Sequence, residues 1–570
     1  MTNKKGTDCL IIGFNDSEFA SYIDMVRSMG TDSGAYRDLN LAFINYNNKP
    51  YRSMDILNHF YYEDKAGPRQ LFHNADFLWP VVTYLGSYLS RHGFTFDYVN
   101  LFHLEQDKLR EKLLNDDILT IAVTTTLYVS PHPILEIISF IRRYNQTAKI
   151  LVGGPYMLNQ TKMYDSAGLQ RQLKYLGADI YVVSNEGESA LVNILSALKQ
   201  GSSLDQVDNL AYKKGNEYVV TATSTESNPL EENMIDYSLF PREDLNEFVT
   251  LRTAKSCPFS CSFCGFPQRA GKYKYLSVAL VEQELNAIRE IETVSTLTFI
   301  DDTFNVPRDR FRDMLKMMIR NNYGFKWNSF YRSDHGDAET IELMAKAGCE
   351  GVFLGIESGS DTQLERMNKT SRRHNYMTAI PQMRDVGIST HANVIVGFPG
   401  ETYETYQDTV SLIEEAKPNT FRAQLWYADP VTPIWQKKDQ YGVKGSAFSW
   451  THNTMDYQTA CDWVDKMFIS TRGSTWLPQN GFEQWSTFYL QRKGMSFQQI
   501  LEFLKSFNAV IKHQLTNAEQ PIPPSLRENL RRSCQFDRRS ERNGQVNAAA
   551  TGLTVAQSNS PVSGSQTAGL

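Results

Sequence analysis

The chain has 570 residues, of which 41% are hydrophobic, and a formal net charge of −6. Its length predicts about three or four domains, and its composition is sufficient for large buried cores. The acidic balance gives no footprint for nucleic acid or for an anionic membrane. No apolar run approaches the roughly 18 residues of a membrane-spanning helix. The apolar stretch near the N-terminus is too short for a signal peptide, so we expect a cytoplasmic protein.

Residues 1–202 alternate short apolar segments with amphipathic ones. Strands are expected at 9–14, 96–101, 119–126, 149–153 and 179–183, and helices at 80–92, 104–114, 133–144 and 188–199. Apolar strands that alternate with helices predict a doubly wound, Rossmann-like α/β domain, which binds ligands beyond the carboxyl ends of its strands. The residues at those ends are Thr125, Thr126, Gly153, Gly154, Glu186, Gly187 and Glu188, which could also be ordinary turn residues.

Residues 203–246 are predicted to form a linker with two strand-like pieces, LAYKK and EYVVTA. From 247 to 429 the alternation resumes, with strands expected at 249–252, 296–300, 326–330, 351–355 and 392–396 and helices at 279–291, 308–321, 338–347 and 376–386. About six β/α units of this kind predict a partial (β/α)6 barrel with its chemistry at the carboxyl ends of the strands. The aromatic-rich residues 430–542 are expected to form a mostly helical region that caps the barrel and completes a substrate pocket. Residues 543–570 have no charged side chain and are expected to be a disordered tail.

Three cysteines, Cys257, Cys261 and Cys264, lie in the run SCPFSCSFCGFP with C-x3-C-x2-C spacing. Cysteine thiolates bind iron–sulfur clusters, and a tight loop with this spacing can direct three of them at three irons of a cubane. No fourth cysteine lies nearby, so one iron would stay open for a small molecule. Structural zinc sites, the alternative, usually use four ligands in paired C-x2-C spacing. The loop therefore favours a [4Fe-4S] cluster as metal site and catalytic centre.

The cysteine loop resembles the signature of radical S-adenosylmethionine (SAM) enzymes, in which the open iron binds the amino and carboxylate groups of SAM. Four later segments, FIDDTFNVP, WNSFYRSD, FLGIESGS and VIVGFPGET, resemble strand ends of that class. The resemblance implies SAM as a cofactor, with contacts from Phe263, Asp302 or its neighbour Asp301, Arg332, Glu357, Ser358, Gly397, Pro399 and Lys369. Each position also has a structural alternative, such as a core aromatic for Phe263 or a salt bridge for Arg332.

The segments before the loop resemble the cobalamin-binding domain that precedes the cluster domain in one class of radical SAM enzymes. WPVVTYLGSYLSRHGFTFDYVNL resembles its entry, and AKILVGGP resembles its fourth strand. The D-x-H-x-x-G motif that gives cobalt a histidine in other cobalamin proteins is missing, because GFNDSEF follows the first strand. The resemblance implies cobalamin at the strand ends named above, with Tyr128 against the corrin and His132 as an alternative ligand. It also implies a small-molecule substrate and an electron donor such as flavodoxin or ferredoxin, with no nucleic acid or membrane as partner.

The run GTDSGAYRDLNLAFINYNNKP, at residues 30–50, resembles a segment of the PhpK-type P-methyltransferase family of phosphinothricin and bialaphos biosynthesis. That family methylates phosphorus in a phosphinate. The resemblance implies a cobalamin-dependent radical SAM methyltransferase with an H-phosphinate acceptor, an anion for which Arg332 is a candidate partner. Three alternatives stay open: a C-methyltransferase of another natural-product intermediate, a cobalamin radical SAM enzyme that cyclises or rearranges its substrate, and a non-catalytic cobalamin or redox sensor.

Overall fold

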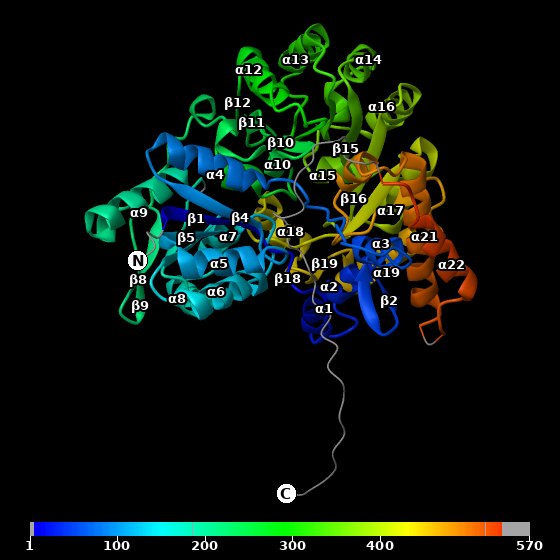
Figure 1. Cartoon of the computed structure of the whole chain (residues 1–570). Helices are drawn as coiled ribbons and strands as arrows, with labels where there is room; N and C mark the ends of the chain where they lie inside the picture. Colours follow the sequence, from blue (N-terminus) through cyan, green and yellow to red (C-terminus); the bar gives the residue numbers. More distant parts are fainter. Residues whose placement is uncertain (1–4, 185, 519, 539–570) are drawn as a thin grey trace, which may run out of the picture.

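The computed structural model describes residues 5–184, 186–518 and 520–538. Two seven-stranded sheets organise this part of the chain, one before and one after residue 247. Figure 1 shows them as a blue-to-cyan layer and a green-to-yellow layer that face each other. The tail predicted at residues 543–570 lies outside the described residues. None of the described helices combines the length and apolarity needed to cross a bilayer.

The first sheet has the strand order β4-β1-β5-β6-β7-β8-β9. Its parallel strands are β1 (Gly6–Phe14), β4 (Phe96–Leu101), β5 (Asp117–Thr124), β6 (Lys149–Gly153) and β7 (Ile180–Val182). The antiparallel hairpin of β8 (Leu210–Lys214) and β9 (Glu217–Val220) extends the sheet beyond β7. The segment predicted as a linker therefore contributes two strands, because Leu210 and Ala211 are buried against the sheet.

The alternating side chains of β1 explain why helices cover both faces of this sheet. Cys9 and Ile11 belong to one apolar core, and Leu10 and Ile12 belong to another. The covering helices are α4 (Pro80–Arg91), α5 (Gln106–Asn115), α6 (His132–Tyr144), α7 (Pro155–Met163), α8 (Ser166–Leu176) and α9 (Glu188–Gln200). The predicted doubly wound arrangement is thus present, and α7 and α8 are additions to the predicted helices.

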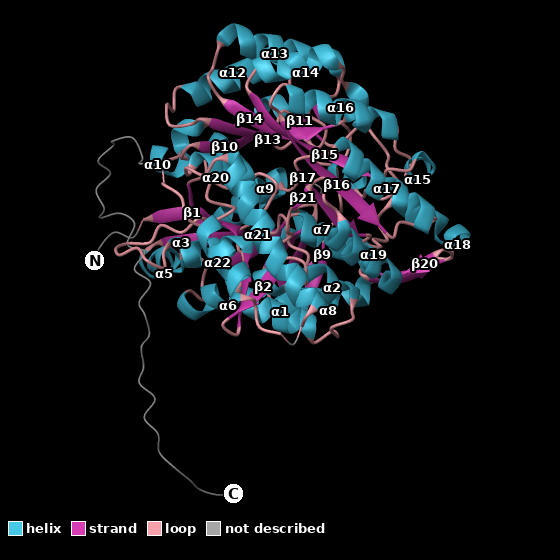
Figure 2. Ribbon diagram, turned by 90° about the vertical axis from the view of Figure 1, so that its right-hand side faces the viewer, coloured by secondary structure: helices cyan, strands magenta, loops and turns pink. Residues whose placement is uncertain are grey.

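The second sheet is parallel throughout, with the order β10-β13-β14-β15-β16-β17-β21. Its strands are β10 (Phe248–Leu251), β13 (Thr296–Phe299), β14 (Lys326–Tyr331), β15 (Cys349–Glu357), β16 (Ser389–Val396), β17 (Thr420–Leu425) and β21 (Thr475–Trp476). Figure 2 shows these strands beneath an arc of helices: α12 (Val278–Arg289), α13 (Arg308–Asn321), α14 (Ala338–Lys346), α16 (Arg373–Asp385) and α17 (Tyr403–Ala416). Six strands carry the predicted barrel, and the seventh comes from the C-terminal region.

The C-terminal region is mostly helical, as predicted. Its helices are α18 (Lys438–Tyr441), α19 (Tyr457–Ser470), α20 (Ser486–Arg492), α21 (Phe497–Thr516) and α22 (Pro524–Ser533), and its small sheet is β18 (Lys444–Ser446), β19 (Ser449–His452) and β20 (Met455–Asp456). Phe488 of α20 packs against Phe353 of β15, with ring centroids 6.1 Å apart. The region therefore packs against the second sheet, and its predicted role as a cap of the barrel stays a prediction.

The segment at residues 30–50 docks on this C-terminal region. It includes α2 (Gly34–Leu39), β2 (Phe43–Tyr46) and the first residues of β3 (Lys49–Arg52), and it lies between α1 (Phe19–Arg27) and α3 (Ser53–Tyr61). Arg37 forms ion pairs with Asp462, at 2.7 Å, and with Asp465 on α19. Figure 1 shows these blue elements beside the yellow and orange helices α19 and α21. The insert thus ties the first domain to the last.

Candidate cofactor and active site

The cysteine loop joins β11 (Ala254–Lys255) to α11 (Phe266–Ala270), while β12 (Lys274–Tyr275) pairs with β11. Its backbone is held by the segment after α15 (Asp361–Arg366), because the Ser262 N–H donates to the Met367 carbonyl at 2.8 Å. The Asn368 side chain donates to the Ser260 carbonyl, also at 2.8 Å. These contacts fix the loop independently of any bound group.

The three loop cysteines are free thiols that share one partly enclosed site. Burial raises the pKa of Cys257, and it raises the pKa of Cys264 to about 11, although the Phe266 N–H donates to the Cys264 sulfur at 3.4 Å. The charge of a Cys261 thiolate raises the pKa of both Cys257 and Cys264 further. A metal centre compensates such charges, so three neighbouring thiols in a fixed loop fit a cluster.

Phe263 and Lys369 lie together beside this loop. The Lys369 ammonium is 5.9 Å from the centre of the Phe263 ring and 3.3 Å from a Glu357 carboxylate oxygen. The Glu357 side chain is only partly buried, and its backbone has a φ of +67° at a bulge at the end of β15. An aromatic face, a cation and a carboxylate at the cluster loop are groups suited to adenine, a carboxylate and a ribose.

Arg332 and Ser358 are already engaged within the protein. Arg332 is 9% exposed, pairs with Asp334 at 3.0 Å and lies with its guanidinium carbon 3.7 Å from the centre of the Phe259 ring. Ser358 is fully buried, with its hydroxyl 3.2 Å from that of Thr409. Arg332 therefore supports Phe259 within the cluster loop, and Ser358 supports the contact between β15 and α17.

Gly397 and Pro399 are buried after the end of β16. Gly397 has a φ of +91°, and a Cβ there would collide with Ala460 and with the Trp450 ring. The Gly397 carbonyl accepts a hydrogen bond from His452 at 3.0 Å if the tautomer places the proton on Nε2. The close approach that requires a glycine here is made by the C-terminal region.

The two aspartates after β13 have different surroundings. Asp301 is buried and accepts hydrogen bonds from the backbone of Thr253 and Ala254 at 2.7 and 2.8 Å, which fixes the start of the cluster loop. Asp302 is open to a cavity yet surrounded by protein, and burial, followed by the charge of Asp301, raises its pKa to about 7. Asp302 is thus the member of the pair available to a ligand.

An apolar cavity of about 290 Å³ lies at the carboxyl ends of β5, β6 and β7. Seven of the predicted cobalamin residues line it: Thr125, Thr126, Gly153, Gly154, Glu186, Gly187 and Glu188. Gly154 has a φ of +109°, and a Cβ there would come within 2.8 Å of the Thr125 hydroxyl oxygen. The remaining wall is formed by side chains that the sequence did not single out: Trp79, Val81, Tyr84, Leu85, Val182, Leu191, Arg252 and Ile300.

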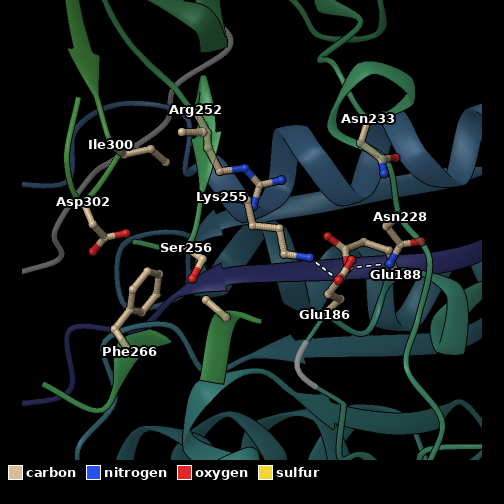
Figure 3. A pocket seen from close by; sticks show the side chains of 12 residues that line it. Glu186, Glu188, Asn228, Asn233, Arg252, Lys255, Ser256, Phe266, Ile300 and Asp302 are labelled. Carbon is tan, nitrogen blue, oxygen red and sulfur yellow. Dashed lines mark hydrogen bonds and ion pairs between the residues drawn. The ribbon is translucent and has the colours of Figure 1, made fainter. Parts of the chain in front are cut away.

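A second, polar cavity of about 220 Å³ continues from the apolar one toward the cluster loop. Glu186, Glu188, Arg252 and Ile300 line both cavities. Figure 3 shows Asp302, Ser256 and Phe266 at one end of the polar cavity and Glu186 and Glu188 at the other. Lys255 forms an ion pair with Glu186 across this space. The strand ends of the first domain and the cysteine loop therefore line two adjoining cavities.

Tyr128 is not among the residues that line either cavity. It is 8% exposed, and its hydroxyl oxygen accepts a hydrogen bond from the Asn15 N–H at 2.7 Å. Its ring lies 5.9 Å from that of Phe14 in the core beneath the loop that replaces the D-x-H-x-x-G motif. The contact of Tyr128 with the corrin stays a prediction.

Asp16 of the same loop lies beside two histidines from other segments, His73 and His103. His73 Nε2 lies 3.2 Å from both Asp16 and the Nε2 of His103. Backbone N–H groups donate to the Nδ1 atom of each ring, which places the proton of a neutral ring on Nε2. Arg52 also pairs with Asp16 at 2.8 Å. Protonated Nε2 atoms and an adjacent cation disfavour a metal ion at this position.

Residues 251–413 match the family model of the radical SAM superfamily. An uncharacterized methyltransferase of Pyrococcus horikoshii is 24% identical over 335 residues, which cover 57% of this chain and 70% of the relative. An anaerobic magnesium-protoporphyrin IX monomethyl ester cyclase of Rubrivivax gelatinosus is 26% identical over 381 residues, which cover 63% of this chain and 66% of the relative. The chain thus spans about two thirds of these relatives.

Two solved structures share the fold. The radical SAM methyltransferase TsrM of Kitasatospora setae, with tryptophan and a SAM analogue bound, has a TM-score of 0.52 and 18% identity over 66% of this chain and 75% of its own. The cobalamin-dependent SAM radical enzyme OxsB, with aqua-cobalamin bound, has a TM-score of 0.51 and 14% identity over 82% of this chain and 73% of its own.

These findings confirm a radical SAM domain at residues 251–413 within an α/β fold. The domain implies a [4Fe-4S] cluster and SAM, as the cysteine loop predicted. The three cysteines fall within the matched residues, and so do the later strand ends. The fold is also that of enzymes solved with cobalamin bound.

Proposed function

We propose that the chain is a cobalamin-dependent radical SAM methyltransferase. The observation that carries this proposal is that the two cavities adjoin, because Glu186, Glu188, Arg252 and Ile300 line both. A methyl carrier in the first domain and a radical source at the cysteine loop would then act on one substrate. The methyltransferases among its relatives and fold neighbours support the same reaction class.

The protein's own groups would hold and orient these cofactors. Cys257, Cys261 and Cys264 would ligate the cluster, Phe263 would contact the adenine, and Asp302 would accept a hydrogen bond from SAM or substrate. When bound, the cluster and SAM supply a 5′-deoxyadenosyl radical, and cobalamin supplies a transferable methyl group. The apolar cavity suits a flat aromatic base, and its walls would exclude water from the neighbouring reactive space.

The acceptor that we propose is the phosphorus of an H-phosphinate in natural-product biosynthesis. A P–H group is not a nucleophile, so ordinary transfer from SAM does not reach it, whereas a radical can abstract its hydrogen. The resemblance of residues 30–50 to the P-methyltransferase family supports this choice. The proposal includes a one-electron donor of the flavodoxin or ferredoxin type.

The test uses anaerobically reconstituted protein with cobalamin, SAM, a strong reductant and a demethyl-phosphinothricin-type H-phosphinate. Mass spectrometry measures 5′-deoxyadenosine, S-adenosylhomocysteine and methylated phosphinate. Near-equal amounts of all three would support radical methylation of phosphorus. Formation of 5′-deoxyadenosine and S-adenosylhomocysteine without methylated phosphinate would support a methyltransferase but exclude this acceptor. Cobalamin binding without consumption of SAM in a cluster-loaded sample would favour a sensor instead.

A cyclase is the second candidate, because one curated relative is a magnesium-protoporphyrin monomethyl ester cyclase. Such a reaction consumes SAM as a radical source without transferring its methyl group. With the correct substrate, 5′-deoxyadenosine would then form without a matching amount of S-adenosylhomocysteine. The ratio of the two products therefore separates a cyclase from a methyltransferase of carbon or phosphorus.

A further inference from the structure

Arg252 is a cation at the junction of the two cavities. It directly follows β10, and its backbone N–H donates to the Tyr84 hydroxyl oxygen at 2.9 Å. Its guanidinium carbon lies 4.8 Å from the centre of the Tyr84 ring, on the wall of the apolar cavity. The Nε atom is buried without a hydrogen-bond partner among the described residues. A buried guanidinium donor is costly to leave unpaired, so the position lacks an acceptor.

The carboxylates nearby do not supply this acceptor. Glu186 is paired with Lys255. Burial raises the pKa of Glu188 and raises that of Glu284 to about 8, and the charge of Arg252 only partly offsets both effects. Within the described chain, no carboxylate oxygen lies within the 4.0 Å of an ion pair with Arg252. Arg252 is therefore a cation without an ion-pair partner among the described residues.

We propose that Arg252 is the receptor for a singly charged phosphorus oxyanion bound where the two cavities meet, an inference that rests on the proposed function and deepens it. A guanidinium presents two parallel N–H donors that match an O–P–O edge. The proposed ligands carry this edge in two places, the phosphodiester of cobalamin's nucleotide loop and the phosphinate of the acceptor. The apolar cavity on one side of Arg252 suits the base attached to such a phosphodiester, and the polar cavity on the other side reaches the cluster loop.

The test follows the reaction of arginines with phenylglyoxal in the full-length wild-type protein, by mass spectrometry. Arg252 is compared with Arg320 of α13, whose side chain is 64% exposed and pairs with Glu282 at the surface. The probes are cobalamin, cobinamide (which keeps the corrin but lacks the phosphodiester and the base), dimethyl phosphate and an H-phosphinate. The readout needs neither the cluster nor turnover.

We expect dimethyl phosphate or the H-phosphinate to slow labelling of Arg252 while that of Arg320 stays unchanged. Protection by cobalamin but not by cobinamide would identify the phosphodiester as the natural anion, and protection by the H-phosphinate in the presence of cobalamin would identify the acceptor. If no probe protects Arg252, or if Arg252 does not react in the free protein, the proposal fails. The two proposals can fail separately. If dimethyl phosphate protects Arg252 from labelling but the cluster-loaded protein forms no 5′-deoxyadenosine, the oxyanion site is supported and the proposed function is refuted.

A substitution measures the contribution of the charge. Arg252→Gln should weaken binding of the protecting oxyanion at least tenfold, with cobinamide affinity changed less than twofold, as expected for a charge-assisted bidentate contact. Arg252→Lys should recover part of the loss, because it keeps the charge but not the fork geometry. Arg320→Gln is the matched control, with equal charge removed from the surface. The proposal would be overturned if Arg252→Gln lowered the affinities for cobalamin and cobinamide equally and left those for dimethyl phosphate and the H-phosphinate unchanged. Arg252 would then only maintain the shape of the cavity.

Discussion

Glu401 gives the sharpest test of the electrostatics around the second sheet. It lies in the segment VIVGFPGET, is 1% exposed and accepts a hydrogen bond from the Gly397 N–H. Its Oε1 atom is buried without a partner among the described residues. Burial raises the pKa of Glu401 from 4.5 to about 8, and the Gly397 N–H offsets this only in part. The substitution Glu401→Gln keeps an acceptor oxygen and removes the ionisable proton.

The sign follows from the raised pKa. The folded state holds its proton up to about pH 8, whereas the unfolded state loses it near 4.5. The stability due to Glu401 is therefore complete below pH 4.5 and is lost as the pH rises toward 8. Between pH 6 and pH 9 the wild type loses the stability that corresponds to about two pKa units. The free energy of unfolding of Glu401→Gln should therefore rise by about 2.7 kcal/mol relative to that of the wild type over this range. For a domain of this size that corresponds to roughly 5–10 °C in thermal midpoint.

The assay is hydrogen exchange by mass spectrometry of peptides covering residues 389–413, corrected for intrinsic exchange rates, because a multidomain chain does not unfold in one step. The protection of Glu401→Gln relative to the wild type should rise between pH 6 and pH 9. Glu404→Gln, three residues later and exposed, is the matched control and should show no such rise. An unchanged difference between the two pH values would mean that Glu401 already ionises at pH 6, which refutes the reasoning.

Three further predictions concern the cofactors and the insert. Replacement of any one loop cysteine by Ala should abolish 5′-deoxyadenosine formation in reconstituted protein while cobalamin still binds by absorbance titration, and retained cleavage would remove that cysteine as a ligand. Gly154→Val should lower cobalamin affinity at least tenfold, because its side chain meets Thr125 and fills the apolar cavity, whereas Gly177→Ala, at a φ of +77° in open space, should leave that affinity unchanged. Gly34→Ala should lower the thermal midpoint by several degrees, because the added Cβ collides with the Phe448 carbonyl oxygen, and an unchanged midpoint would show that the insert can shift.

The regular β/α alternation was the part of the fold most readily predicted from sequence. β4, β6 and α13 begin and end at the predicted residues, because each is a complete apolar or amphipathic segment with clear breaks. β8 and β9 were predicted as strand-like pieces of a linker, but their place in the first sheet was not, since lysines at the end of β8 and a glutamate at the start of β9 obscure the buried residues. β21 has two residues, too few for any periodic signal.

The candidate site divides in the same way. Three thiolates must reach one cluster from a single short loop, which restricts the spacing of the cysteines. The cluster loop could therefore be recognised from the sequence alone. The apolar cavity needed tertiary contact, because Tyr84 and Leu191 come from helices far apart in sequence. Arg252 carried no motif, and Arg332 appeared more available than it is because sequence does not show that Asp334 lies within 3.0 Å. Partners of charged side chains are the feature that pattern reasoning could not supply.

The docking of the insert has a consequence for how the chain is made. Arg37 pairs with Asp462, 425 residues later, and Asn45 bonds to Gln514. At about 5–20 residues per second, a ribosome needs roughly 20–85 s to produce that interval. The insert therefore leaves the ribosome long before the C-terminal region that it packs against has been synthesised. Until then its apolar side chains lack the partners that bury them in the native fold. The N-terminal domain is completed only at the end of translation, so a nascent chain interrupted in the barrel is the species that chaperones are expected to hold.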